Sequence, residues 1–260
     1  MDERSTQQIS FNCGVSKSNK RTAKIYHGEV ASPGQFPWMV ALIIKLEKKG
    51  KPNVYFLKCT GQIIAPKYVL TAAHCLTGYK EIKVLAGYFD ARERMDPSKL
   101  IPVDKIIVHK DFREITKGHS SLAVNDIALM KVKFSFDFSD PEVGMACLPV
   151  VRSKPIDIQF KPGDRVTIMG FGVKENGKQS CCLRYAETVK TLNWRECLLN
   201  MKSTPYSDND IIYLFGKAIN KRQFAPLEMI NKLLLLAWET LEVDSIIRHQ
   251  NTMGNISFGD

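Results

Sequence analysis

Short apolar runs separated by turn residues are the feature that most limits how this chain of 260 residues can fold. The runs are rich in Val, Ile, Phe and Tyr, and Gly, Pro, Asn or Asp stands between them. β-Branched and aromatic residues favour strands, and short strands at such spacing predict a sandwich or a barrel. Neither an alternation of strands with helices nor a repeat of fixed length is evident. We therefore predict an all-β fold from about residue 25, carried by the runs FPWMVALII, VYFLKCTGQIIA, YVLTAAH, IKVLAGYF, KIIVH, DIALMKV and RVTIMGFGV.

The two ends of the chain differ from this central part in their residue pattern. Residues 1–24 are polar and basic, which predicts an exposed, flexible leader, and they lack the apolar segment of a signal peptide. Residues 225–249 carry apolar side chains on one helical face, and Pro226 suits the first turn of a helix. We therefore expect a leader at 1–24, a folded domain at 25–212, and a tail at 213–260 with a helix over 225–248.

The formal net charge is +10, which can favour acidic partners. Lys and Arg are interleaved with Asp and Glu, and there is no basic helix with interleaved aromatic residues, no zinc-finger spacing and no RNA-binding signature. A solvated basic surface explains this charge, so we expect no nucleic-acid partner. The apolar run LLLLAW at residues 233–238 is far shorter than the roughly 18 residues that a membrane span needs. We expect no membrane span, no metal and no cofactor.

Seven cysteines are many for a cytosolic chain of this kind, and the number is odd. If the chain folds in an oxidising compartment, at least one thiol has no intramolecular partner. The cysteine content therefore favours secretion, whereas the polar N-terminus does not support it. The cysteines are Cys13, Cys59, Cys75, Cys147, Cys181, Cys182 and Cys197.

Two polar residues stand out because of the sequence that borders them. His74 follows an apolar run in VLTAAHCL, directly before a cysteine, and Asp126 precedes the apolar run of NDIALMKV. Alone, each has a structural explanation, as a hydrogen-bonded core histidine and as a turn or cap acid. Together they match two members of a catalytic triad, in which a carboxylate fixes the histidine tautomer and stabilises the imidazolium. The pair therefore indicates nucleophilic catalysis, provided that the chain supplies a nucleophile.

The blocks TAAHC and NDIAL, in this order, resemble two of the three signature blocks of the trypsin-like serine proteases. Four more segments are similar to that family: IYHGEVASPGQFPWMVAL, CTGQIIAPKYVLTAAHC, MACLPV and VTIMGFG. The resemblance covers about residues 13–210, and the leader and first strand resemble the arthropod clip-domain proteases or their inactive homologues. It implies a chymotrypsin-like double β-barrel, peptide-bond hydrolysis, an extracellular location and no cofactor.

The resemblance assigns roles to residues around the base. His74 matches the general base, and Asp126 matches its orienting partner. Cys59 and Cys75 match the disulfide that flanks the base. The resemblance thus implies that Asp126 is hydrogen-bonded to the base and that a disulfide of the adjacent Cys75 holds the backbone beside it.

The resemblance also implies an activation region. Cys13 and Cys147 match the disulfide that ties an activation peptide to the catalytic domain. Lys24–Ile25 matches the activation cleavage site, and an ordinary surface lysine explains Lys24 equally well. The segment IYHG at residues 25–28 departs from the family's Ile-Val-Gly-Gly. The acid that receives the new N-terminus in the family has no counterpart downstream, so we expect that the activation switch is not inherited even if Lys24 is cleaved.

The third signature block, Gly-Asp-Ser-Gly-Gly-Pro, does not occur in the sequence. Ser257 lies in GNISFGD, where the residue order is wrong, and no other serine after Asp126 has a glycine-rich turn around it. The segment YSDNDII at residues 206–212 resembles the stretch before the family's next cysteine, which is absent, so Cys197 lacks its expected partner. We therefore expect a complete first barrel at about residues 25–149, a truncated second barrel and no nucleophile. The serines concerned are Ser135, Ser139, Ser153, Ser180, Ser203, Ser207, Ser245 and Ser257.

Three functions stay open at this point. The first is a non-catalytic serine-protease homologue that binds a protein or peptide, for example another protease. The second is an active serine endopeptidase whose serine-bearing segment is lost only from this isoform or gene model. The third is a non-functional truncated product. Substrate specificity, the oligomeric state and the pairing of Cys181, Cys182 and Cys197 also stay open.

Overall fold

The computed structural model describes residues 13–18, 29–46, 54–78, 81–90, 95–117, 120–148, 165–172 and 180–190. The helix predicted over 225–248, Lys24–Ile25 and Cys197 lie outside these residues. No helix in the described part is long and apolar enough to cross a membrane. The elements are β1 (Glu29–Val30), β2 (Met39–Leu46), β3 (Val54–Ala65), β4 (Tyr68–Thr71), η1 (Ala73–Cys75), β5 (Ile82–Ala86), η2 (Pro97–Lys99), β6 (Ile101–Val108), β7 (Arg113–Lys117), β8 (Ser120–Val124), β9 (Ala128–Val132), β10 (Arg165–Gly170) and β11 (Arg184–Lys190).

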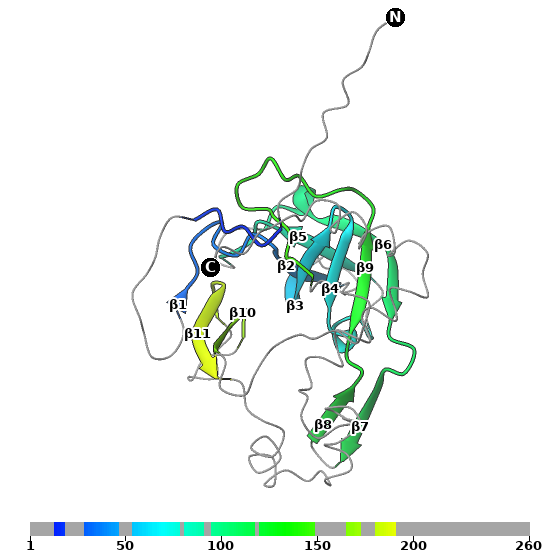
Figure 1. Ribbon diagram of the computed structural model, residues 1–260. Helices are drawn as coiled ribbons and strands as arrows, with labels where there is room; N and C mark the ends of the chain where they lie inside the picture. The colour runs from blue at the N-terminus through cyan, green and yellow to red at the C-terminus, as the bar shows by residue number, and fades with distance from the viewer. Residues whose placement is uncertain are drawn as a thin grey trace, which may run out of the picture.

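Six antiparallel strands close into a barrel in the order β2-β3-β4-β9-β6-β5, which occupies the upper right of Figure 1. Pairing of Val40 with Ala86 joins β2 to β5 and closes the ring. Closure removes the unpaired strand edges that an open sheet would expose. The all-β prediction is therefore confirmed, and the apolar runs of the sequence overlap all six barrel strands, although KIIVH covers only the second half of β6.

The first six residues of strand β2, residues 39–44, are apolar without interruption, and their packing explains why. Successive side chains of a strand point to opposite faces. Val40, Leu42 and Ile44 lie in the largest buried cluster, inside the barrel. Ala41 and Ile43 lie in a second buried cluster, which covers the outer face of the same strand. Both faces of β2 are therefore buried over residues 40–44, and the charged Lys45 follows only at the end of the strand.

Three further strands form a separate sheet in the order β1-β11-β10, drawn to the left of the barrel in Figure 1. Glu29 pairs with Tyr185, and the Tyr185 hydroxyl donates a hydrogen bond of 2.9 Å to the Glu29 carboxylate. The expectation that the first barrel begins near residue 25 is therefore wrong for residues 29–30, which belong to the second sheet. Phe171 and Leu183 of this second half pack in one buried cluster with Met39 of the barrel.

The structure contains strands that the apolar pattern did not reveal. Strands β7 and β8 pair as a hairpin that extends from the foot of the barrel in Figure 1. Their sequences, REITK and SSLAV, alternate little and carry many polar residues. Ile115 is the one apolar residue of REITK and pairs with Leu122, so the apolar pattern is too short to predict this hairpin.

The closed barrel predicts a sharp contrast between two aliphatic residues. Leu42 is fully buried, whereas Ile106 on β6 is 43% exposed. Leu42→Ala should lower the free energy of unfolding by about 2–5 kcal/mol, because it leaves a cavity in the core. Ile106→Ala, the matched control, should change it by about 0.5 kcal/mol or less. Chemical denaturation measures both values, and similar losses for the two variants would contradict the packing described here.

Candidate active site

His74 lies on the single helical turn η1, directly after strand β4. Its neighbours Ala73 and Cys75 are buried, and they anchor the turn on both sides of the histidine. The Leu76 amide donates to the Ala73 carbonyl at 2.9 Å, which closes the turn. The Cys75 sulfur is bonded to Cys59 of β3, so η1 is also tied covalently to the neighbouring strand. Because its two neighbours point inward, the side chain of His74 points outward and is 48% exposed.

Asp126 lies at the tip of the turn between β8 and β9. The Ile127 amide donates to the Asn125 carbonyl at 2.8 Å, which makes the turn tight. Asn125 has a φ of +55°, a left-handed conformation that asparagine tolerates better than most residues. Its side-chain amide donates to the Asp111 carbonyl at 2.8 Å and holds the turn in place. Buried Val124 and Ile127 fix the backbone on either side, and Asp126 projects between them.

The pairing of β4 with β9 brings these two residues together across 52 positions of sequence. Thr71, at the end of β4, lies opposite Ala128, at the start of β9. The turn after one strand and the turn before the other therefore meet at the same rim of the barrel. The structure thus places the two residues singled out by the sequence side by side.

Asp126 holds His74 with both carboxylate oxygens. Oδ2 lies 2.6 Å from Nδ1 of the ring, and Oδ1 accepts the backbone N–H of His74 at 2.8 Å. An ionised carboxylate only accepts hydrogen bonds, so Nδ1 must carry the proton. In the neutral ring Nε2 then has a free lone pair. This arrangement fits a general base that takes up a proton at Nε2.

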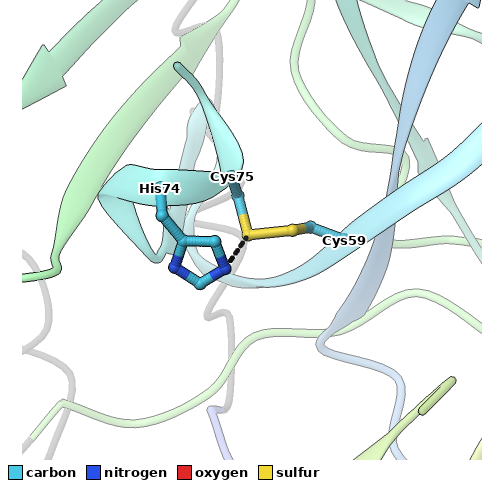
Figure 2. A group of neighbouring side chains, drawn as sticks. All are labelled: Cys59, His74 and Cys75. Atoms are coloured by element: carbon cyan, nitrogen blue, oxygen red, sulfur yellow. Dashed lines mark hydrogen bonds between the residues drawn. A yellow bond between two sulfur atoms is a disulfide. The ribbon is translucent and has the colours of Figure 1, made fainter. Parts of the chain in front are cut away.

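Nε2 faces the Cys59–Cys75 disulfide and lies 3.5 Å from the Cys75 sulfur, as Figure 2 shows. The three donor atoms of Cys59, His74 and Cys75 lie within 4.8 Å of one another, which is a spacing that metal ligands can have. Metal binding by cysteine needs the thiolate, and here each sulfur is bonded to the other. The group therefore does not fit a metal ion and acts as a covalent brace behind the histidine.

Residues 13–18 lie along the barrel as a tethered segment. Cys13 is disulfide-bonded to Cys147, as the resemblance implied, and the Gly14 amide donates to the Met145 carbonyl at 2.7 Å. The Lys17 ammonium donates to the carbonyls of Asp140 and Val143 at 3.0 and 2.9 Å. Several polar contacts besides the disulfide therefore hold this segment in place.

One positioning residue of the site escaped the sequence reasoning. Asn125 precedes Asp126 and adopts the left-handed backbone that aims it. The only signal in the sequence is the residue type itself, since Asn is enriched at positive φ. That signal is too general to single out one asparagine.

Comparison with known proteins agrees with this geometry. The family model described as Trypsin matches residues 25–221. The human chymotrypsin-like elastase family member 3B is 33% identical over 135 residues, which cover 51% of this chain and 46% of that protein. The chain thus spans about half the length of this curated relative.

A solved structure of the protein called GrC is similar in fold. The TM-score is 0.51 at 26% identity, and the match covers 70% of this chain and 71% of that one. Together with the closed barrel and the adjoining sheet, these matches confirm a chymotrypsin-like double β-barrel architecture. Because the family match spans most of the sequence and includes both His74 and Asp126, the chain belongs to the trypsin family of serine proteases.

Proposed function

We propose that this chain is a non-catalytic serine-protease homologue that acts by binding a protein or peptide partner. The observation that carries the proposal is an assembled His74–Asp126 pair in a sequence that contains no Gly-Asp-Ser-Gly-Gly-Pro block. Nε2 of His74 is poised to accept a proton, and within the described residues no serine hydroxyl bonds to it. The pair therefore has the base of the reaction without the group that the base activates.

The expected effect on catalysis is large. Loss of the nucleophile from a triad of this type costs on the order of 10⁶ in kcat. The residual rate comes from the oxyanion hole and from substrate binding, and the glycine-rich block that carries the oxyanion hole is the same block that is missing. Peptide-bond hydrolysis by this form of the chain should thus fall below useful levels.

The rest of the proposal follows from the scaffold. Both disulfides of the described residues suit an oxidising, extracellular compartment. Tethering of residues 13–18 fits an activation-peptide-like leader at 1–24 with cleavage at Lys24–Ile25, as in a zymogen. A trypsin-like domain at 25–212 and a tail at 213–260 complete the proposed organisation. Clip-domain proteases and their inactive homologues remain the subgroup that we propose.

A second candidate function is an active serine endopeptidase in a longer form of this chain. The observation that favours it is the intact base geometry, with Asp126 bonded to both the ring and the backbone of His74. Such a form would cleave peptide bonds through an acyl-enzyme. The genomic DNA decides between the two: an in-frame exon encoding Gly-Asp-Ser-Gly-Gly supports the longer enzyme, and its absence removes that candidate.

A fluorophosphonate probe tests the proposed inactivity. We expect no labelling of the expressed chain, because the probe reacts with a serine oxygen that a histidine has activated. Gel fluorescence measures the labelled fraction, and an active trypsin-like protease in the same tube is the positive control. Labelling that disappears in His74→Ala would contradict the proposal.

Binding is tested separately from catalysis. The chain is immobilised on beads and incubated with its native fluid, from which it should retain a protease or a protease substrate. A pull-down that recovers neither of them counts against a binding role. A soluble product with one cooperative unfolding transition would in turn be evidence against the non-functional alternative.

Replacement of Asp126 tests the tautomer on which the base role rests. In Asp126→Asn the side-chain oxygen can still accept the His74 backbone N–H, and the amide NH₂ then faces Nδ1. The ring proton should therefore move from Nδ1 to Nε2, which abolishes the base. Long-range ¹H–¹⁵N spectra above the titration range of histidine report the tautomer. Asp111→Asn, an exposed neighbour, is the control, and the same tautomer in both variants would refute the assignment.

A further inference from the structure

Cys181 and Cys182, shortly before β11, have their sulfurs 3.0 Å apart. This distance is shorter than the about 3.5–4.0 Å of ordinary contact between two carbon atoms, although sulfur is the larger atom. A closed disulfide measures about 2.05 Å, so a small movement would join the two sulfurs. The two thiols are adjacent in the sequence and already point toward each other.

The backbone around the pair is fixed by a buried serine. The Ser180 hydroxyl donates to the Cys182 carbonyl at 2.7 Å and accepts the Cys182 N–H at 3.3 Å. Ser180 is only 3% exposed, and its own amide donates to the Gly172 carbonyl at 3.0 Å. Neither cysteine can therefore drift far, and their relative orientation is set by the fold.

The pair also lies at the seam between the barrel and the second sheet. Cys182 forms an isolated antiparallel bridge with Asp90, just after β5. The Leu183 amide donates to the Phe89 carbonyl at 2.6 Å, and the Ala31 amide donates to the Leu183 carbonyl at 2.8 Å. A change in the backbone at Cys181–Cys182 would thus act on the hydrogen bonds that join the two halves of the molecule.

We propose that Cys181 and Cys182 form a redox-active vicinal pair, which closes reversibly into a disulfide ring by exchange with a small disulfide such as oxidised glutathione. The Cys181 thiolate attacks one glutathione sulfur and releases the first glutathione thiolate. The Cys182 thiolate then attacks the Cys181 sulfur of the mixed disulfide and releases the second. Two thiols are oxidised, one disulfide is reduced, and the two protons pass to the released glutathiones.

Accessibility sets the order of the two steps. Cys181 is partly exposed, whereas Cys182 is 3% exposed. Thiol–disulfide exchange requires that the attacking sulfur reach its target, so Cys181 reacts first with the external disulfide. Cys182 needs to reach only its neighbour and closes the ring from inside.

Ring closure between neighbours makes the bond easy to reverse. Adjacent Cα atoms across a trans peptide are about 3.8 Å apart, below the about 4.4–6.8 Å that disulfides usually span. The Cα atoms of Cys59 and Cys75 are 5.9 Å apart, and those of Cys13 and Cys147 are 4.9 Å apart, within that range. Strained disulfides are reduced more easily, so the vicinal ring should open while the other two bonds stay closed.

Peptide mapping of the native protein tests the proposal. The folded chain is treated with oxidised glutathione, remaining thiols are alkylated, and the chain is cut with trypsin. Trypsin cuts after Lys178 and after Arg184, which releases the peptide 179–184. This peptide contains both cysteines of the pair and no other cysteine. We expect this peptide to lack two hydrogen atoms and to carry no alkyl group. After mild treatment with a dithiol it should carry two alkyl groups, while the peptides of the other two disulfides remain linked.

The same map contains the outcomes that would overturn the proposal. A peptide 179–184 that is cross-linked to the Cys197 peptide, that carries glutathione, or that takes up two alkyl groups after oxidation refutes the ring. If the Cys181–Cys182 disulfide is reduced only under conditions that also reduce Cys59–Cys75, the proposal that the ring opens more easily is refuted.

Two single substitutions complete the design. Cys197→Ser removes the alternative partner and should leave ring formation unchanged. Cys181→Ser, at the partly exposed position, should abolish the ring. The rate of hydrogen exchange at the Leu183 amide should differ several-fold between the oxidised and the reduced protein. In Cys181→Ser, the same oxidising and reducing treatments should leave this rate unchanged. Equal exchange in oxidised and reduced protein would overturn the coupling of the pair to the seam.

Discussion

The register between β4 and β9 is the constraint on which the site depends. Thr71 opposite Ala128 places the turn that bears His74 beside the turn that bears Asp126. A slip of one residue would turn every side chain of a strand to the opposite face. Val69 and Ala128 are completely buried in the barrel, so such a slip would expose the core. The burial that stabilises the barrel therefore also sets the 2.6 Å contact between the imidazole and the carboxylate.

The second consequence of this arrangement is that an exposed histidine lies between two buried residues. His74 is half exposed, yet Ala73 and Cys75 on either side of it are buried, and Cys75 is bonded to Cys59. A disulfide that closes a loop of this length stabilises a fold by about 3 kcal/mol in the chain-entropy description. The histidine thus gains a rigid backbone from its neighbours, while its side chain stays half exposed to solvent.

Local sequence patterns predicted the barrel strands and the chemistry-bearing residues, because burial and residue type are local properties. His74 and Asp126 were recognisable from the blocks that contain them, and the two disulfides followed from the family resemblance. Long-range pairing was less accessible. The strand Glu29–Val30 is only two residues long, and its place beside β11 depends on Tyr185, over 150 residues away in the sequence. The left-handed turn at Asn125 and the contact between the sulfurs of Cys181 and Cys182 depend on backbone and side-chain torsions, which residue spacing does not encode.

The hydrogen bonds of Asp126 give the pair a structural role that does not depend on a nucleophile. One carboxylate oxygen binds the imidazole, but the other accepts the backbone N–H of His74. That amide belongs to the short turn η1, whose N-cap residue Ala72 offers no side-chain acceptor. The bond is exposed to solvent, so water can compete for the same N–H, and the carboxylate supplies an ordered, charged acceptor in its place. Asp126 is therefore a structural part of the barrel rim as well as the partner of the ring. The bond to the backbone N–H can form with any residue other than proline at position 74, whereas the bond to Nδ1 requires the histidine.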